Sequence, residues 1–176
     1  GKADIFEEGT VDGRSICSEI GMTFQSSGRP TRDAFWVLPA SSDMWALVQL
    51  RERIKVLKHF KETLEAAESS TILAIFDDRQ HVIVAVVRSL LLEVTEDSEL
   101  NVMSREGQPN KEMQKRLREA QTINITMAII SLPFDNGLKV DTVANDKSYI
   151  SVKNVICFLY RLMKQTVKGN KTNSLK

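Results

Sequence analysis

The residues best suited to acid–base chemistry or metal binding lie around His81. Asp77 and Asp78 precede this histidine within an otherwise apolar stretch, so the three side chains could form a small acid–base or metal cluster. A solvated turn whose aspartates cap backbone groups is the simpler interpretation. The second histidine, His59, lies in a segment of helical spacing and is interpreted as a partly exposed helix residue. A small enzyme built on the His81 cluster is therefore a secondary hypothesis, and no metal or cofactor is predicted.

Sequence motifs that mark catalytic or phosphate-binding sites are missing from the sequence. The chain contains no Walker A sequence, no glycine-rich dinucleotide fingerprint, no nucleophile elbow and no zinc-protease helix motif. Gly169-Asn170-Lys171-Thr172 resembles only the end of a phosphate-binding loop and lacks its first glycine. We therefore predict a non-enzymatic protein.

Cysteine usage and hydropathy indicate a reducing compartment. Cys17 and Cys157 lie far apart, and Cys157 stands in an apolar segment that predicts a buried thiol. No apolar run approaches the roughly 18 residues that would predict a membrane span, and no signal peptide opens the chain. Because the chain starts with Gly1 rather than Met, we expect a fragment of a larger intracellular protein of the cytoplasm or nucleus.

Basic side chains gather on two predicted helical faces and could bind phosphate groups. The net charge is only +1, and glutamates interrupt both faces, so the simpler interpretation is the solvated back of an amphipathic helix. Nucleic-acid binding remains an alternative function. Its candidate residues are Arg51, Lys55, Lys58, Lys111, Lys115 and Arg118. A third basic cluster comprises Arg161, Lys164, Lys168 and Lys171.

Aromatic residues on either side of Pro39 are candidates for binding a protein partner. Phe35, Trp36 and Trp45 could anchor the core, or they could be exposed, because tryptophan is favoured where partners bind. With no catalytic motif in the chain, the leading prediction is a protein–protein interaction module. It would serve as a scaffold or a subunit of a complex, in an oligomeric state that the sequence leaves open.

The elements predict an α+β domain with an antiparallel core sheet. A long helix (about 43–68), a polar helix (about 109–121) and a C-terminal helix (about 148–168) show three- and four-residue apolar spacing or capping residues. They would cover the sheet within a single globular domain at 34–168. An N-terminal arm (1–33) and a basic tail (169–176) would flank that domain.

The sheet itself depends on segments that two interpretations fit. Residues 72–94 hold two apolar runs around a polar break at 77–80, which favours a hairpin, although a helical stripe also fits. A second hairpin is predicted across residues 90–103, and alternation at 122–132 and 138–143 predicts further strands. Asp135-Asn136-Gly137 predicts a turn. If the runs are helices instead, the fold is all-α, either armadillo-like or a helical bundle.

Overall fold

The computed structural model describes residues 42–170, with side chains from Trp45 onward. The chain divides into two compact units, Gly1–Glu52 and Arg53–Lys176, and the second contains most of the described residues. The helices are α1 (Ser42–Glu65), α2 (Ile72–Val94), α3 (Lys111–Glu119), α4 (Thr122–Asp135), α5 (Val140–Asn145) and α6 (Ile150–Val167), and a 3₁₀ turn (Lys147–Tyr149) leads into α6. The strands β1 (Thr95–Glu96) and β2 (Gln108–Pro109) form one antiparallel pair.

The antiparallel core sheet predicted at residues 72–94 is wrong, because this segment is the single helix α2. The described residues are mostly helical and carry one small two-stranded sheet, so the α+β prediction holds only in that coarse sense. Buried positions recur at helical intervals through Phe76, Ile83, Val87, Leu90 and Val94. The polar residues of the supposed turn lie on the exposed side of α2, where water satisfies them without breaking the helix.

The strands predicted at 122–132 and 138–143 are also wrong. The alternating segment forms α4, where the Thr126 hydroxyl donates a hydrogen bond to the Thr122 carbonyl oxygen at 2.5 Å and both threonines are buried. The Thr126 hydroxyl is thereby satisfied within the helix, and the Thr122 hydroxyl is buried without a hydrogen-bond partner. Neither threonine lies on the solvent face that the alternation predicted, although Asn124 between them is exposed. The predicted turn is confirmed, because α4 ends at Asp135 and Gly137 adopts a φ of 95°.

The three predicted helices are confirmed within a few residues. They correspond to α1, to α3, and to the 3₁₀ turn with α6. Asn110 caps α3, with its side-chain oxygen accepting a hydrogen bond from the Met113 amide at 2.9 Å. Cys157 is a correction, since the thiol predicted to be buried is exposed on α6.

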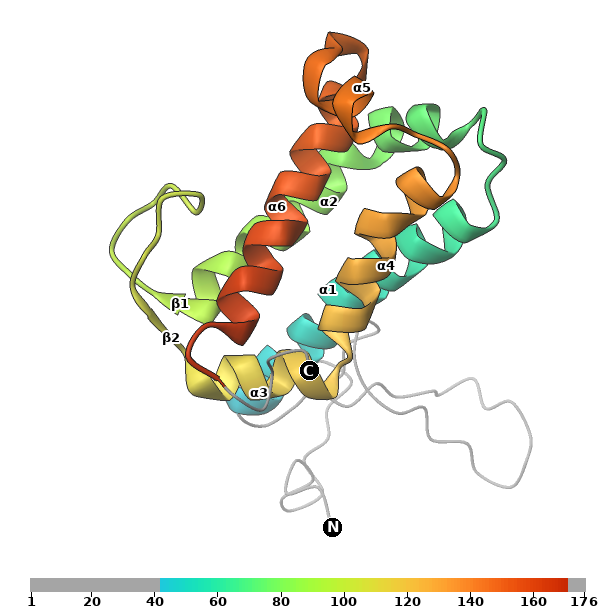
Figure 1. The fold of residues 1–176 in the computed structure, drawn as a ribbon. Coiled ribbons are helices and arrows are strands. Elements are labelled where there is room, and N and C mark those ends of the chain that lie inside the picture. The colour runs from blue at the N-terminus through green and yellow to red at the C-terminus, as the bar shows by residue number, and fades with distance from the viewer. Residues whose placement is uncertain (1–41, 171–176) are drawn as a thin grey trace, which may run out of the picture. The chain divides into compact units, whose positions relative to one another are not determined.

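The core of the second unit lies mainly between α2 and α6, which form the most extensive helix pair among those described. Figure 1 shows α6 running along α2, with α3 across the C-terminal end of α6. Val155 and Leu159 of α6 and Val87 of α2 are fully buried. Phe60 of α1 meets Phe76 of α2 edge to face, with ring centroids 5.3 Å apart. These contacts form the rigid base for the connection between α2 and α3.

Candidate interaction site

The connection from α2 to α3, residues 95–110, is long and contains little regular structure, yet its backbone is fixed by side chains. We call it the clasped loop. Its ends are joined by the β1–β2 pair, in which Thr95 faces Pro109 and Glu96 faces Gln108. The Asn110 amide also donates to the Val94 carbonyl oxygen at 2.9 Å. The second hairpin predicted across residues 90–103 is therefore wrong: β1 pairs with residues 108–109, on the far side of the loop.

Arg105 fills the inside of the clasped loop. Its side chain is buried, and its guanidinium donates hydrogen bonds to three carbonyl oxygens, those of Thr95 (2.7 Å), Asp97 (2.6 Å) and Glu99 (2.6 Å). A guanidinium presents several donors in one rigid plane and is suited to bridging several acceptors at once. These bonds hold β1 and the residues that follow it against Arg105, in place of the backbone hydrogen bonds of a regular hairpin.

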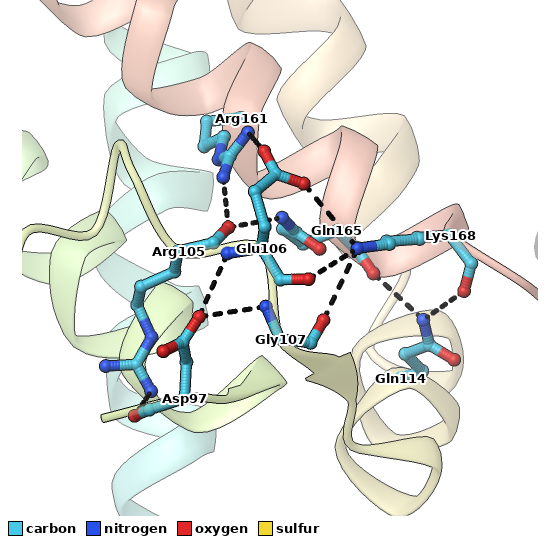
Figure 2. A network of polar contacts seen from close by, with 8 residues as sticks. All are labelled: Asp97, Arg105, Glu106, Gly107, Gln114, Arg161, Gln165 and Lys168. Carbon is cyan, nitrogen blue, oxygen red and sulfur yellow. Dashed lines mark hydrogen bonds and ion pairs between the residues drawn. The ribbon is translucent and has the colours of Figure 1, made fainter. Parts of the chain in front are cut away.

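The Asp97 carboxylate closes the loop from the other side (Figure 2). It accepts hydrogen bonds from the backbone amides of Glu99 (3.0 Å), Glu106 (3.0 Å) and Gly107 (2.9 Å). These bonds lower the pKa of the Asp97 carboxyl below its ordinary value of 3.8, and those from Glu99 and Gly107 contribute most. The bond from Glu106 and the charge of Arg105 act in the same direction. The ionised carboxylate is therefore the form that holds the loop together.

Helix α6 binds the second half of the clasped loop, at residues 105–106, through Arg161 and Gln165. Arg161 is buried and donates to the Glu106 carboxylate at 3.0 Å and also to the Arg105 carbonyl oxygen. Gln165 donates to the same Arg105 oxygen at 3.2 Å. Arg161 lowers the pKa of the Glu106 carboxyl below its ordinary value of 4.5, through its hydrogen bond and its charge. The charges of Lys164 and Lys168 make smaller contributions in the same direction.

Lys168, just after the end of α6, adds a third point of attachment. Its ammonium donates to the carbonyl oxygens of Glu106 (3.0 Å) and Gly107 (3.3 Å) and lies 3.6 Å from the Glu106 carboxylate (Figure 2). Gln114 of α3 is buried and donates to the carbonyl oxygens of Gln165 (2.9 Å) and Lys168 (3.0 Å). The Gln114 amide thereby satisfies carbonyl groups at the C-terminal end of α6 and joins α3 to α6, while Lys168 joins α6 to the loop.

The side chains at the tip of the clasped loop contrast with this buried interior. Val102 is buried and anchors the tip, whereas Leu100 is 82% exposed and Met103 is 38% exposed. Glu96 and Glu99 are also exposed. The loop therefore presents apolar and acidic side chains on a backbone that is held from inside.

The residues predicted to bind a protein or nucleic acid do not gather at the clasped loop. Phe35 and Trp36 lie outside the described residues, and Trp45 is 36% exposed near the start of α1. The basic candidates fall on two helices: Arg51, Lys55 and Lys58 are exposed on α1, and Lys111, Lys115 and the half-buried Arg118 lie on α3. Lys111 donates to the Gly169 carbonyl oxygen at 2.8 Å.

The candidates for acid–base or metal chemistry lie on the surface of α1 and α2. His59, His81, Asp77 and Asp78 are exposed, and Asp78 forms an ion pair with Arg79 at 2.8 Å. Within residues 42–170, no group of three or more histidine, cysteine or carboxylate side chains is arranged to hold a metal ion.

Sequence reasoning missed the residues that build the clasped loop. Arg161 and Lys168 were assigned to a solvated basic cluster, but Arg161 is buried and both bind Glu106. One signal was available. Arg161 and Gln165 are one helical turn apart and flank the buried Leu162, which places polar side chains beside the apolar stripe of α6.

Comparison with known protein families gives a match to the RIH domain. The sequence model of the RIH domain matches residues 80–176, which is more than half of the chain and includes the clasped loop and α6. No curated protein matches the chain. Among the described helices, none combines the length and the apolar character that a membrane crossing requires.

Proposed function

The chain belongs to the RIH domain family, and on that premise we propose that it is a non-enzymatic protein-interaction module. RIH domains are domains of larger intracellular receptor proteins, so this chain would act as one part of such a protein. Its task would be to present a fixed surface to another protein or to another part of the same receptor. The cytoplasmic side of a membrane is the place where we expect it to work.

The observation that carries the proposal is the structural use of two buried arginines. Burying a guanidinium is costly, and its donors offset that cost when they find acceptors. The Nη groups of Arg105 and Arg161 donate to carbonyl oxygens and to one carboxylate of the clasped loop, whereas the two Nε groups are buried without a partner. Connections longer than about 12–15 residues without regular structure are uncommon and are usually functional or disordered. The clasped loop is ordered by hydrogen bonds to two buried arginines, whose burial is costly, and this supports a binding role.

Purification and reconstitution test the proposal. The full 176-residue chain is immobilised, proteins retained from an extract of its own cells are identified by mass spectrometry, and each is purified and titrated against the chain by calorimetry. We expect at least one purified protein to bind saturably with a defined stoichiometry. If none of the purified proteins binds, the interaction-module proposal fails.

Nucleic-acid binding remains a prediction through the exposed basic residues of α1 and α3. A titration of the chain with duplex DNA and with single-stranded RNA at two salt concentrations tests it, because phosphate contacts make the affinity fall steeply with salt. Salt-dependent binding that persists at physiological ionic strength and is weakened by Lys115→Ala would favour this alternative. Otherwise the basic faces are solvated helix surfaces.

A further inference from the structure

The tip of the clasped loop has a fixed backbone as well as a fixed base. Three side chains in succession each accept a hydrogen bond from the amide two residues ahead: Asp97 from Glu99 (3.0 Å), Glu99 from Asn101 (2.8 Å) and Asn101 from Met103 (3.1 Å). The Ser104 amide donates to the Asn101 carbonyl oxygen at 2.9 Å. Leu100 is therefore the central residue of the second of these turns, and its backbone is held by hydrogen bonds on both sides.

Leu100 is the most exposed large apolar side chain among the described residues, at 82% of its surface. A single exposed leucine on a flexible loop would need no explanation. Here the supporting backbone is ordered before any partner arrives, so a partner that buries Leu100 does not have to order the loop as well. Val102, two residues along, is buried and fixes the direction in which the tip projects.

The exposed charged side chains of the clasped loop are all acidic, because its one basic residue, Arg105, is buried. Asp97 accepts hydrogen bonds from backbone amides of the loop, and Glu106 pairs with Arg161 and Lys168. Glu96 and Glu99 are exposed and form no ion pair with any basic side chain of residues 42–170. A partner that brings lysine or arginine side chains to these two carboxylates gains attraction as well as orientation. A partner with acidic groups in the same places would be repelled.

We propose that the tip of the clasped loop, residues 98–104 with Glu96, is a docking surface for a partner protein segment that has an apolar face flanked by basic side chains. Leu100 packs on the apolar face, and Glu96 and Glu99 face the basic side chains. The inference deepens the proposed function, on which it rests, by naming the surface and the chemistry of its partner.

The test uses a synthetic 18-residue amphipathic helical peptide of leucine and lysine, titrated into the full chain and followed by amide chemical shifts. We expect shifts concentrated at residues 96–104 and absent with a matched leucine–glutamate peptide. Leu100→Ser should weaken binding at least tenfold, since the burial of a leucine side chain is lost. Leu92→Ser is the matched control, because Leu92 is also exposed (44%) but lies on α2, and it should leave the affinity unchanged.

Two variants that each remove one negative charge isolate the electrostatic contribution to peptide binding. Glu96→Gln should weaken the lysine peptide about two- to fivefold at low ionic strength and reduce the salt dependence, whereas Glu119→Gln on α3 should not. The proposal is overturned if no shifts occur at millimolar peptide, if they fall outside residues 96–104, or if Leu100→Ser binds like the wild type. A dimer of the chain that Leu100→Ser abolishes would also overturn it, by assigning the tip to a second copy.

The outcome separates the inference from the proposed function. If a purified natural partner binds the wild-type chain and Leu100→Ser equally well, the interaction-module proposal stands and the docking surface lies elsewhere. If no purified protein binds but the lysine peptide still meets every expectation above, the tip is a docking surface and the failure belongs to the broader proposal.

Discussion

Gly107 is the residue at which one methyl group should undo the clasped loop. A Cβ atom at this position would lie 2.0 Å from the Glu96 carbonyl oxygen and 2.9 Å from the Asp97 Cβ, whereas ordinary contacts of a Cβ are 3.4–4 Å. The Glu96 oxygen is a backbone atom within β1, so relief requires the strand pair to separate by more than an ångström. The Gly107 amide would then withdraw from the Asp97 carboxylate, to which it donates at 2.9 Å.

We expect Gly107→Ala to lower the free energy of unfolding by about 2–3 kcal/mol, in the upper part of the range for overpacked sites. For a chain of this size, that loss corresponds to a fall in Tm of roughly 4–12 °C. Urea titration followed by circular dichroism gives the free energy. Amide hydrogen exchange at Glu106 and Gly107 reports the loop directly, and both amides should lose protection.

Gly137→Ala is the comparison that separates a clash from a general effect of replacing glycine. Gly137 has a φ of 95°, and a Cβ there would meet nothing within 4 Å, so its cost is conformational strain of about 1–2 kcal/mol. The loop amides should keep their protection in this variant. The steric reasoning is refuted if Gly107→Ala unfolds at the wild-type urea concentration with unchanged protection in the clasped loop.

Three further variants test other parts of the structure. The pKa of Asp97 is lowered, so its contribution to stability is present above pH 3.8 and is lost as the pH falls through the folded-state value. Asp97→Asn should therefore flatten the acid limb of the unfolding free energy, and an unchanged acid limb would contradict this. Asp146→Asn, at a carboxyl whose pKa is also lowered, should flatten the acid limb while leaving the loop amides protected. Gln121→Gly should raise the free energy of unfolding by about 0.5–1 kcal/mol, because Gln121 holds a φ of 56° that glycine adopts freely. Gln80→Gly, inside α2, should instead lower the free energy of unfolding by about 1 kcal/mol. Changes of the same sign in urea titration would refute the strain argument. Arg161→Lys should cost about 1–3 kcal/mol in the same assay, since an ammonium cannot reach both acceptors as a planar guanidinium does, and a cost near zero would show that the buried pair is dispensable.

The sequence was informative where local chemistry decides the structure. Asn110 marks the start of α3 because its side chain caps the next turn, and Gly137 marks a turn because it takes a positive φ. The helical stripe of α6 was visible because its buried residues follow one period. Each of these features depends on residues within a few positions of one another.

Segment 72–94 was misjudged because its local preferences conflict with its environment. Its run of valine and isoleucine favours a strand locally, but Phe76, Ile83 and Val87 reach one face only in a helix. Phe76 packs on Phe60 of α1, and α2 also packs along α6, more than fifty residues further along the chain. Tertiary packing therefore overrides the local preference.

The clasped loop could not be predicted from local patterns at all. Arg161 meets the carbonyl oxygen of Arg105 across 56 residues of chain, and neither residue belongs to a periodic pattern that would pair them. The bonds of Arg105 to its own loop follow no repeat either. A pair of polar residues beside the apolar stripe of α6 was the only local trace of this network.

Backbone order in the clasped loop is the most direct test of the idea that buried arginines hold a ready-made binding surface. Nuclear spin relaxation of the amides of residues 96–107 in the full chain measures it. Order parameters near 0.85, like those of rigid helices such as α2 and α6, are the predicted result. Values below about 0.6 at Leu100 and its neighbours would contradict the account, because a flexible tip could not be a preorganised docking surface.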